Sequence, residues 1–349
     1  MKKSGLLHKG LYWLNLLVAL LLLVSFVLPY VPPKSFPTLS VLSLGVSPLI
    51  LLNIVFASYW FLRLKTNFFL SGIILGISYF HFHPFVEFSS EGNTENYENH
   101  LKVLSYNVRL FNAYEKDPSK ENVSEIISDI ISTEQPDVFC IQEFYKEHSE
   151  DFSTYPYQYI HFKRRASKLG HAIFSKYPII KEGAFDFEDS NNNALFVDIV
   201  KEEDTLRVYN LHLQSLSITP SVSSLQEGDT DRLRKRIGTS FSKQQDQVKR
   251  VLEHKKATNL PVLLCGDFNN TPFSYTYRKL KKGMNDAFLE KGNGLGRTYS
   301  FDSYPMRIDY IFGSKEMEVI RFETIKKSFS DHYPISATFA WSPKKKSKN

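Results

Sequence analysis

Cysteine is scarce in this sequence, with two residues in 349, Cys140 and Cys265. Two thiols are too few for the disulfide framework of a small secreted scaffold and for a cysteine-rich zinc site. Each stands inside an apolar, strand-like pattern, where a free thiol behaves as a small buried hydrophobe. A disulfide would require two adjacent strands with suitable geometry. We therefore expect two reduced thiols in the core.

A strong charge of one sign and a short internal repeat are also missing. The formal net charge is only +6 and includes the basic tail "KKKSKN", so charge alone does not indicate nucleic-acid binding. Without a repeat of fixed short period, a solenoid or propeller is excluded. No serine or cysteine occupies a strand-to-helix elbow, which argues against a hydrolase with a nucleophilic serine or cysteine.

Long uncharged runs are present, and all of them lie in the first quarter of the chain. They cover residues 11–31, 40–62 and 68–86. The first has 21 residues, which as a helix reaches about 31 Å, the thickness of a bilayer core. We predict three transmembrane helices within a membrane anchor of residues 1–89. The alternatives are a signal peptide for the first run and buried core helices for all three; the signal peptide is disfavoured because no small-residue cleavage site follows and two more runs do.

Basic residues flanking the runs predict an orientation. The N-terminus carries Lys2, Lys3 and Lys9, the first loop only Lys34, and the second loop Arg63 and Lys65, whereas Glu91, Glu95 and Glu98 follow the third run. The positive-inside rule then places the N-terminus in the cytoplasm. Everything after residue 90 is expected outside the cytoplasm, at the periplasmic face of the inner membrane in a Gram-negative cell.

The remaining chain reads as a linker, one large domain and a tail. Residues 90–101 are polar and acidic without periodicity, as in a linker, and residues 342–349 form a basic tail. Between them, residues 102–341 alternate strand-like segments with two amphipathic helices. We expect one α/β domain with two sheets and flanking helices.

Polar groups interrupt or end several of these strands. They are Asn107, Glu143, His212, Asp267, Asn269, Asp309, Asp331 and His332. Acids, amides and imidazoles suit metal-assisted hydrolysis of a phosphodiester: carboxylates hold a hard divalent cation, an acid or imidazole takes a proton from water, and amide or imidazole donors stabilise charge on phosphorus-bound oxygens. In isolation, Asn107 and Asn269 fit the role of turn formers equally well.

The segments "LSYNV", "DVFCIQE", "YNLHL", "GDFN", "RIDYI" and "SDHYPI" occur in the order of the motifs of the endonuclease/exonuclease/phosphatase superfamily, which the chain resembles from Leu101 to about Ala340. The resemblance implies the four-layer α/β/β/α sandwich of the deoxyribonuclease I type. It also implies Mg²⁺ as the cofactor, with Mn²⁺ as the alternative.

The resemblance further implies roles for the matching residues. Glu143, Asn107 and Asp331 would hold the metal. Asp267 and Asn269 would hold the attacking water and a phosphate oxygen, Asp309 would polarise His332, and His212 would stand near the leaving oxygen.

Two departures limit this comparison. Arg109 stands where abasic-site endonucleases have an acidic metal ligand, and it suits a phosphate rather than a cation. His212 is typical of the deoxyribonuclease and sphingomyelinase branches. Repair of abasic DNA is therefore disfavoured. The role of His171 stays open, and Arg307, Ser175 and Lys176 are weaker candidates for phosphate contacts.

The sequence therefore predicts an integral membrane phosphoesterase that hydrolyses phosphodiester bonds with a divalent metal, of the nuclease type. A lipid or sugar-phosphate phosphodiesterase, similar to a sphingomyelinase, is the alternative, and an inactive membrane-bound binding module is the second. The expected partners are the membrane and a phosphodiester, either nucleic acid or a phospholipid head group. Basic residues around Asn107 and His212 would indicate a nuclease, and an exposed apolar loop, expected within residues 215–236, a lipid enzyme.

Overall fold

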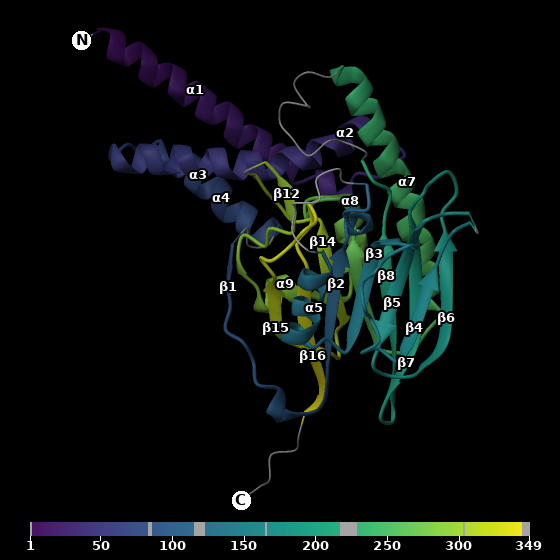
Figure 1. The fold of residues 1–349 in the computed structure, drawn as a ribbon. Coiled ribbons are helices and arrows are strands. Elements are labelled where there is room, and N and C mark those ends of the chain that lie inside the picture. The colour runs from purple at the N-terminus through teal and green to yellow at the C-terminus, as the bar shows by residue number, and fades with distance from the viewer. Residues whose placement is uncertain are drawn as a thin grey trace, which may run out of the picture. The chain divides into compact units, whose positions relative to one another are not determined.

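The structure is a computed structural model that describes residues 2–82, 86–114, 123–164, 166–216, 229–302 and 304–343. Most of the basic tail and residues 217–228 of the expected discriminating loop lie outside these ranges. The chain forms two compact units (Figure 1). The first comprises residues 1–85, 231–245 and 270–278, and the second the rest.

Two six-stranded sheets build the second unit. The first sheet has the spatial order β15 (Glu318–Thr324), β16 (Ile335–Pro343), β2 (Tyr97–Asn107), β3 (Val138–Tyr145), β5 (Leu169–Ser175), β4 (Tyr157–His161). The second has the order β10 (Met284–Asp286), β14 (Asp309–Ser314), β9 (Val262–Asp267), β8 (Asp204–His212), β7 (Asn193–Lys201), β6 (Ile179–Asp186). Each sheet contains one parallel pair, β2 with β3 and β8 with β9. The strand β2 begins at Tyr97, inside the expected linker, because its first residues pair with β16.

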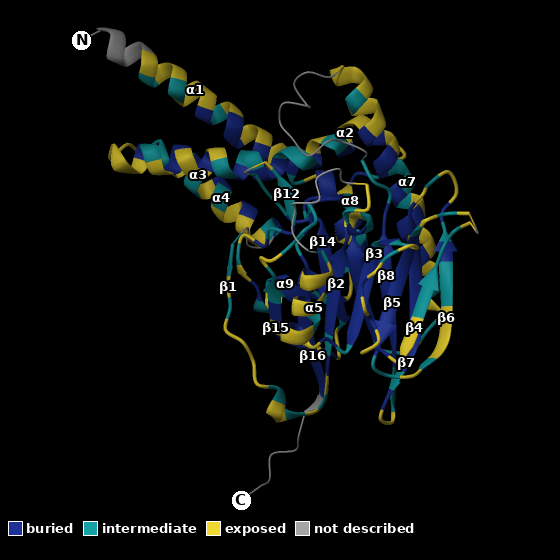
Figure 2. Ribbon diagram, in the orientation of Figure 1, coloured by how far each residue is buried: buried dark blue, intermediate teal, exposed yellow. Residues whose placement is uncertain are grey.

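The main core lies between the two sheets. Alternate residues of β2 and β3, such as Val103 and Val138, face residues of the other sheet, such as Val208 and Leu263. Both cysteines belong to this core as free, fully buried thiols, as expected. In Figure 2 the central strands of both sheets are buried along most of their length, whereas the edge strands β4 and β6 are largely intermediate or exposed.

Helices cover the outer faces. The helix α5 (Val123–Glu134) packs Ile126 and Ile130 against the outer face of the first sheet, beside Phe139 of β3. The helix α7 (Thr230–Lys256) crosses from the first unit into the second. There its His254 packs against Phe196, with the two rings tilted by 46°, and hydrogen-bonds the Tyr209 hydroxyl at 2.7 Å. The second unit is therefore a two-sheet α/β sandwich, the predicted architecture.

Short elements complete the chain, and they are β1 (Glu87–Phe88), η3 (Thr94–Asn96), η4 (Arg109–Asn112), α8 (Tyr275–Lys281), α9 (Ala287–Lys291), β11 (Asn293–Gly294), β12 (Tyr299–Phe301) and β13 (Tyr304–Met306). The pairs β1–β11 and β12–β13 are separate two-stranded sheets.

The first unit is helical. Its helices are α1 (Lys2–Ser25), η1 (Leu28–Tyr30), α2 (Pro37–Val41), η2 (Leu42–Gly45), α3 (Val46–Leu62) and α4 (Phe68–Phe82). The spans Leu7–Tyr30 and Pro37–Leu62 are long and apolar enough to cross a membrane. The third expected span is not supported to the same degree: α4 has 15 residues, about 22 Å of helix, and residues 83–85 of the expected span lie outside the described ranges.

A buried polar network joins the three long helices of this unit. Asn15 donates to Ser71 Oγ at 2.6 Å, Ser71 donates to Asn53 Oδ1 at 2.9 Å, and Trp60 Nε1 donates to Asn15 Oδ1 at 2.9 Å. Asn53 also donates to the Leu49 carbonyl at 2.9 Å. Since these groups satisfy one another inside an apolar bundle, they fix the register of α1, α3 and α4.

Segments distant in sequence complete the helical unit. Phe273 packs with Phe82 at a ring distance of 5.0 Å and belongs to the same apolar cluster as Leu22 and Ile50. Arg278 lies 4.0 Å from the centre of the Tyr30 ring. Residues 270–278 therefore belong to the core of the helical bundle.

Candidate active site

Strand register brings the candidate residues together at one edge of the second unit. In the second sheet, Asp267 of β9 pairs with Asp309 of β14 on one side and with His212 of β8 on the other. In the first sheet, Asn107 ends β2 beside Gln142, the neighbour of Glu143 on β3. Each of these residues stands at or near the end of its strand, and the strands are paired neighbours, so the side chains lie at one edge of the sandwich.

The most closely connected groups are Asp309, His332 and Asp267, all buried. His332 Nδ1 hydrogen-bonds both oxygens of Asp309, at 3.1 and 3.0 Å. Its Nε2 lies 3.7 Å from Asp267 Oδ2. Burial lowers the pKa of His332, but the Asp309 and Asp267 carboxylates outweigh it and raise the pKa to about 10. His332 is therefore an imidazolium whose Nε2 proton faces Asp267.

Asp267 is held by amides. Its Oδ1 accepts the Asn269 backbone N–H at 2.7 Å, and its Oδ2 accepts the side-chain amides of Asn107 at 3.1 Å and Asn269 at 3.0 Å. Burial is the main reason that the pKa of Asp267 is raised, and Asp309 adds to it, while His332 opposes it. This carboxylate therefore accepts a proton more readily than an exposed one.

Glu143 occupies a strained position in β3. Its φ is 54°, in the left-handed region, at the point where the pairing with β5 is irregular. Such a conformation costs roughly 1–2 kcal/mol for a residue with a side chain. The strain turns the carboxylate toward the Asn107 amide, 3.4 Å away. Burial raises the pKa of Glu143, His332 opposes this, and the Asp331 carboxylate raises it further.

His212 and His171 are neutral imidazoles beside these acids. Burial lowers the pKa of His212 well below its usual value, and neighbouring His171 and His332 add to this. His212 Nε2 lies 3.6 Å from Asp267 Oδ2 and 3.8 Å from Glu143 Oε1, and it makes no hydrogen bond within the described part of the chain. The His171 ring lies 5.7 Å from that of His212, and its Nδ1 hydrogen-bonds Asn193 Oδ1.

The donor set fits a divalent cation. The charge of Asp331 acts on Glu143 and that of Asp309 acts on Asp267, and hard oxygen donors of this kind are the ligands that Mg²⁺ prefers. His212 Nε2, buried without a hydrogen-bond partner in the described part of the chain, would be satisfied by a water or phosphate oxygen. Asp267, Asp309 and His332 present potential ligand atoms within 4.8 Å of one another, and His332 Nδ1 already hydrogen-bonds Asp309.

Arg109 begins an unusual turn. Four consecutive residues, Arg109 to Asn112, have φ between 45° and 56°. The Arg109 backbone N–H donates to Asn107 Oδ1 at 3.1 Å, and the Asn112 amide donates to the Phe329 carbonyl at 2.8 Å. The Arg109 guanidinium lowers the pKa of Glu143, so its charge acts on the site.

The structure places the weaker candidates elsewhere. Arg307 pairs with buried Asp286 at 2.8 Å, Ser175 Oγ donates to the Tyr177 carbonyl at 2.8 Å, and Lys176 Nζ donates to the Gln135 carbonyl at 2.9 Å. These contacts stabilise the fold.

Two buried polar residues near the site, Gln142 and Asn210, were not among the predicted ones. Gln142 donates to Asn210 Oδ1 at 2.6 Å, and Asn210 donates to the carbonyls of Ile141 and Ala172, both at 3.0 Å. This network ties the two sheets together below Glu143 and His212. The available signal was a polar residue inside an apolar strand close to a candidate: Gln142 directly before Glu143, and Asn210 two residues before His212.

Comparison with known proteins identifies a family for most of the chain. A family model described as "Endonuclease/Exonuclease/phosphatase family" matches residues 104–332. The chain belongs to this family. Members of the endonuclease/exonuclease/phosphatase family hydrolyse phosphoester bonds. Residues 8–85 match a separate domain of unknown function. Among curated proteins, none matches the chain significantly.

Solved structures show the same fold. An endonuclease/exonuclease/phosphatase family protein from Bacteroides thetaiotaomicron is 19% identical with a TM-score of 0.54, covering 70% of this chain and 97% of its own. A mannosyl-6-phosphatase from the same organism is 19% identical with a TM-score of 0.53, covering 69% of this chain and 100% of its own. A humanised TDP2 from D. rerio is 16% identical with a TM-score of 0.51, covering 69% and 98%. At these identities the likeness establishes the fold alone.

Proposed function

We propose that the chain is a membrane-anchored, divalent-metal-dependent phosphodiesterase of the nuclease type. One observation carries the proposal: the Asp309–His332–Asp267 series meets the Asn107–Glu143 pair at one edge of the sandwich, where Asn107 contacts the carboxylates of Glu143 and Asp267, at 3.4 Å and 3.1 Å. This arrangement combines a proton acceptor, a fixed cationic donor and a set of hard oxygen ligands.

Each residue has a role consistent with its surroundings. Asp267, with its raised pKa, holds the attacking water and takes its proton, and Asn269 fixes the carboxylate by two hydrogen bonds. The His332 imidazolium, oriented by Asp309, donates to a phosphoryl oxygen. His212 is neutral, so it donates a hydrogen bond near the leaving oxygen rather than a full proton.

Glu143, Asn107 and Asp331 would hold the metal, Mg²⁺ or Mn²⁺. When bound, the ion neutralises charge on the phosphate and on the departing alkoxide. Arg109, whose charge already acts on Glu143, is placed to contact a phosphate oxygen of the substrate.

Exposed apolar surface supports anchoring in a membrane. In the most apolar 18-residue stretch of each long span, only 33% of the first and 39% of the second is buried, whereas a core helix would be mostly buried. Figure 2 shows exposed residues along α1 and α3, and they include Leu17, Leu20 and Val55. We propose that α4 crosses as a third span, supported by the buried link between Asn53 and Ser71, so that the catalytic domain lies outside the cytoplasm.

The orientation can be tested with a single introduced thiol. Both native cysteines are fully buried and give little background. Glu203→Cys places a thiol in the exposed turn between β7 and β8. A membrane-impermeant maleimide should label this variant in intact cells or spheroplasts. Labelling that requires lysis would contradict the orientation.

The activity is tested with full-length protein in detergent on bis(p-nitrophenyl) phosphate, with Mg²⁺, with Mn²⁺ and with EDTA. We expect metal-dependent turnover that His332→Gln reduces at least a hundredfold. The matched control is His161→Gln, which disrupts a second Asp–His pair, with Asp186 at 3.0 Å, outside the site. Equal turnover in His332→Gln and the wild type would overturn the proposal.

A lipid or sugar-phosphate diester is the second candidate substrate, and the apolar helices favour it because they place the domain near a bilayer. It is tested by replacing the aryl diester with sphingomyelin in mixed micelles. Faster turnover of sphingomyelin than of DNA or RNA would favour it.

A further inference from the structure

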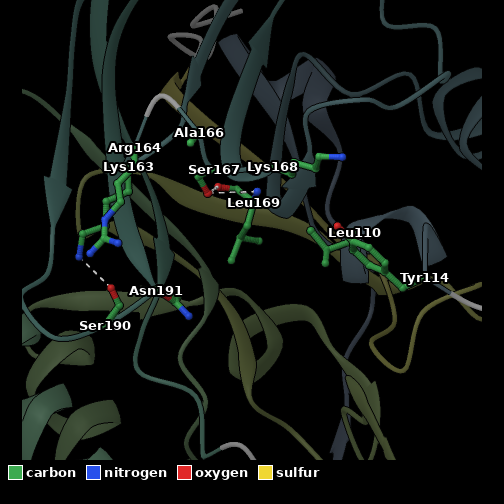
Figure 3. Close-up of a pocket in the computed structure, with 10 residues that line it drawn as sticks. All are labelled: Leu110, Tyr114, Lys163, Arg164, Ala166, Ser167, Lys168, Leu169, Ser190 and Asn191. Atoms are coloured by element: carbon green, nitrogen blue, oxygen red, sulfur yellow. Dashed lines mark hydrogen bonds between the residues drawn. The ribbon is translucent and has the colours of Figure 1, made fainter.

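A pocket of about 550 Å³ lies in the second unit, lined by the turn after β2, the loop between β4 and β5, and the loop before β7 (Figure 3). Leu110 and Tyr114 come from the first of these segments, Lys163, Arg164 and Lys168 from the second, and Ser190 and Asn191 from the third. No aspartate or glutamate is among the described residues that line it.

The pocket is positively charged, and one of its cations is fixed in place. Lys163 Nζ donates to the backbone carbonyls of Phe187 and Ser190, the second at 2.7 Å, as the dashed line in Figure 3 shows. Neutral carbonyls leave the charge of the ammonium uncompensated, and its third N–H remains to donate. Lys168 is partly compensated by Glu147 at 2.9 Å, an exposed pair that solvent weakens. Arg164 is exposed and has no acidic partner in the described ranges.

Aromatic rings accompany these charges. Tyr114 lines the pocket with 67% of its surface exposed. Its ring lies 5.8 Å from that of Tyr145, at an angle of 69°. Lys168 Nζ in turn lies 6.0 Å from the centre of the Tyr145 ring. Exposed aromatic faces beside cations are the pattern by which proteins bind single-stranded nucleic acid, through stacked bases and paired phosphates.

The pocket continues from the candidate active site along two backbone segments. Leu110 directly follows Arg109, within the left-handed turn that begins beside Asn107. Asn191 stands two residues before Asn193, which hydrogen-bonds His171 next to His212. The segments that line this pocket therefore adjoin, along the chain, residues of the candidate active site.

We infer that the pocket is a subsite for single-stranded nucleic acid, which holds a phosphate next to the scissile one on Lys163 and Arg164 and stacks a base on Tyr114. The inference rests on the proposed function and names its substrate class. A lipid head group offers one phosphate and no base for Tyr114 to stack. A duplex keeps its bases stacked on each other, so it leaves Tyr114 unused.

The test is binding without turnover. Full-length protein in detergent is titrated against a fluorescein-labelled oligothymidylate of 12 nucleotides in EDTA, and fluorescence anisotropy reports the affinity at several salt concentrations. We expect Tyr114→Ala to weaken binding about tenfold, since stacking contributes roughly that much per base. Lys163→Ala with Arg164→Ala should weaken it more and reduce the salt slope by about 0.7, because one phosphate contact on a single strand contributes about 0.7.

Matched controls separate charge from packing and from folding. Arg164→Lys keeps the charge and should retain most of the affinity. Lys181→Ala removes an exposed lysine on β6, opposite Asp198 and away from the pocket, and should leave the affinity unchanged. The melting temperature of each variant confirms that it folds. The same oligonucleotide annealed to its complement tests binding of a duplex. Glycerophosphocholine, added as a competitor, tests binding of a lipid head group.

Weakened binding in the pocket variants, with single strand preferred over duplex, would support the inference. Wild-type affinity in Tyr114→Ala and in the double variant would overturn it, as would tighter binding of duplex or competition by glycerophosphocholine at concentrations comparable to the oligonucleotide. Turnover of bis(p-nitrophenyl) phosphate by the wild type is measured separately. The proposed function therefore survives or fails independently of the pocket.

Discussion

The replacement Asp309→Asn tests the chemistry of the site with the least change in shape. Asp309 Oδ2 lies 3.0 Å from His332 Nδ1, and at an effective dielectric constant of about 20 the Coulomb attraction between the two charges is about 5.5 kcal/mol. The Asp267 carboxylate, 3.7 Å from Nε2, still holds the ring, and the new amide still hydrogen-bonds Nδ1. We therefore expect part of that energy, about 4 kcal/mol, to be lost from the transition state, which is a fall in kcat of about 1,000-fold.

The assay is turnover of bis(p-nitrophenyl) phosphate at saturating Mg²⁺, with kcat and KM determined separately. The control is Asp198→Asn, which removes the charge from another buried pair, that of Asp198 with Arg207 at 2.6 Å. This control should lower the melting temperature, since it leaves a buried guanidinium unpaired, and leave kcat of the folded protein unchanged. A loss of less than tenfold in folded Asp309→Asn would refute the reasoning about His332.

Three further predictions concern the metal, pH and the helices. Glu143→Gln should raise the Mg²⁺ concentration for half-maximal turnover at least tenfold, because it removes a charged ligand, and normal Mg²⁺ dependence would contradict that role. Burial lowers the pKa of His171 from 6.5 to about 4, so the unfolded protein takes up a proton below pH 6.5 that the folded protein does not. The free energy of unfolding should therefore fall by up to about 3 kcal/mol as pH falls from 6.5 toward 4. Melting curves of His171→Asn should lack this pH-dependent loss, and an unchanged pH dependence would contradict the prediction. Asn53→Val should lower the free energy of unfolding in mixed micelles by about 1 kcal/mol by breaking the interhelical network, whereas Ser78→Ala, a buried serine of α4 outside that network, should have a smaller effect.

Much of the fold follows from local patterns. The apolar run before Glu143 and the alternating segment before Asn107 predicted β3 and β2, because short apolar or alternating runs rich in β-branched and aromatic residues are typical of strands. The start of β2 at Tyr97 was missed because pairing with β16, rather than composition, extends it.

The site was predictable to the extent that it consists of strand ends. Asp267 and Asp309 stand at the ends of strands that lie side by side, so recognising the strands was enough to collect the residues. The roles depend on distances that the sequence does not contain, such as the 3.0 Å contact with Asp309 that helps to raise the pKa of His332. The pocket beside the site was not predictable, since Lys163 and Ser190 meet only through the folding of two loops without periodicity.

The membership of residues 270–278 in the helical bundle has a practical consequence. Phe273 is 4% exposed among residues of α1, α3 and α4, and it stands four positions after Asn269 of the candidate site. Removing residues 1–89 to obtain a smaller fragment would take away the apolar neighbours of Phe273 and loosen the segment that follows Asn269. Enzymology on this protein is best begun with the intact polypeptide, and inactivity of a shortened version would say nothing about the chemistry of Asp267.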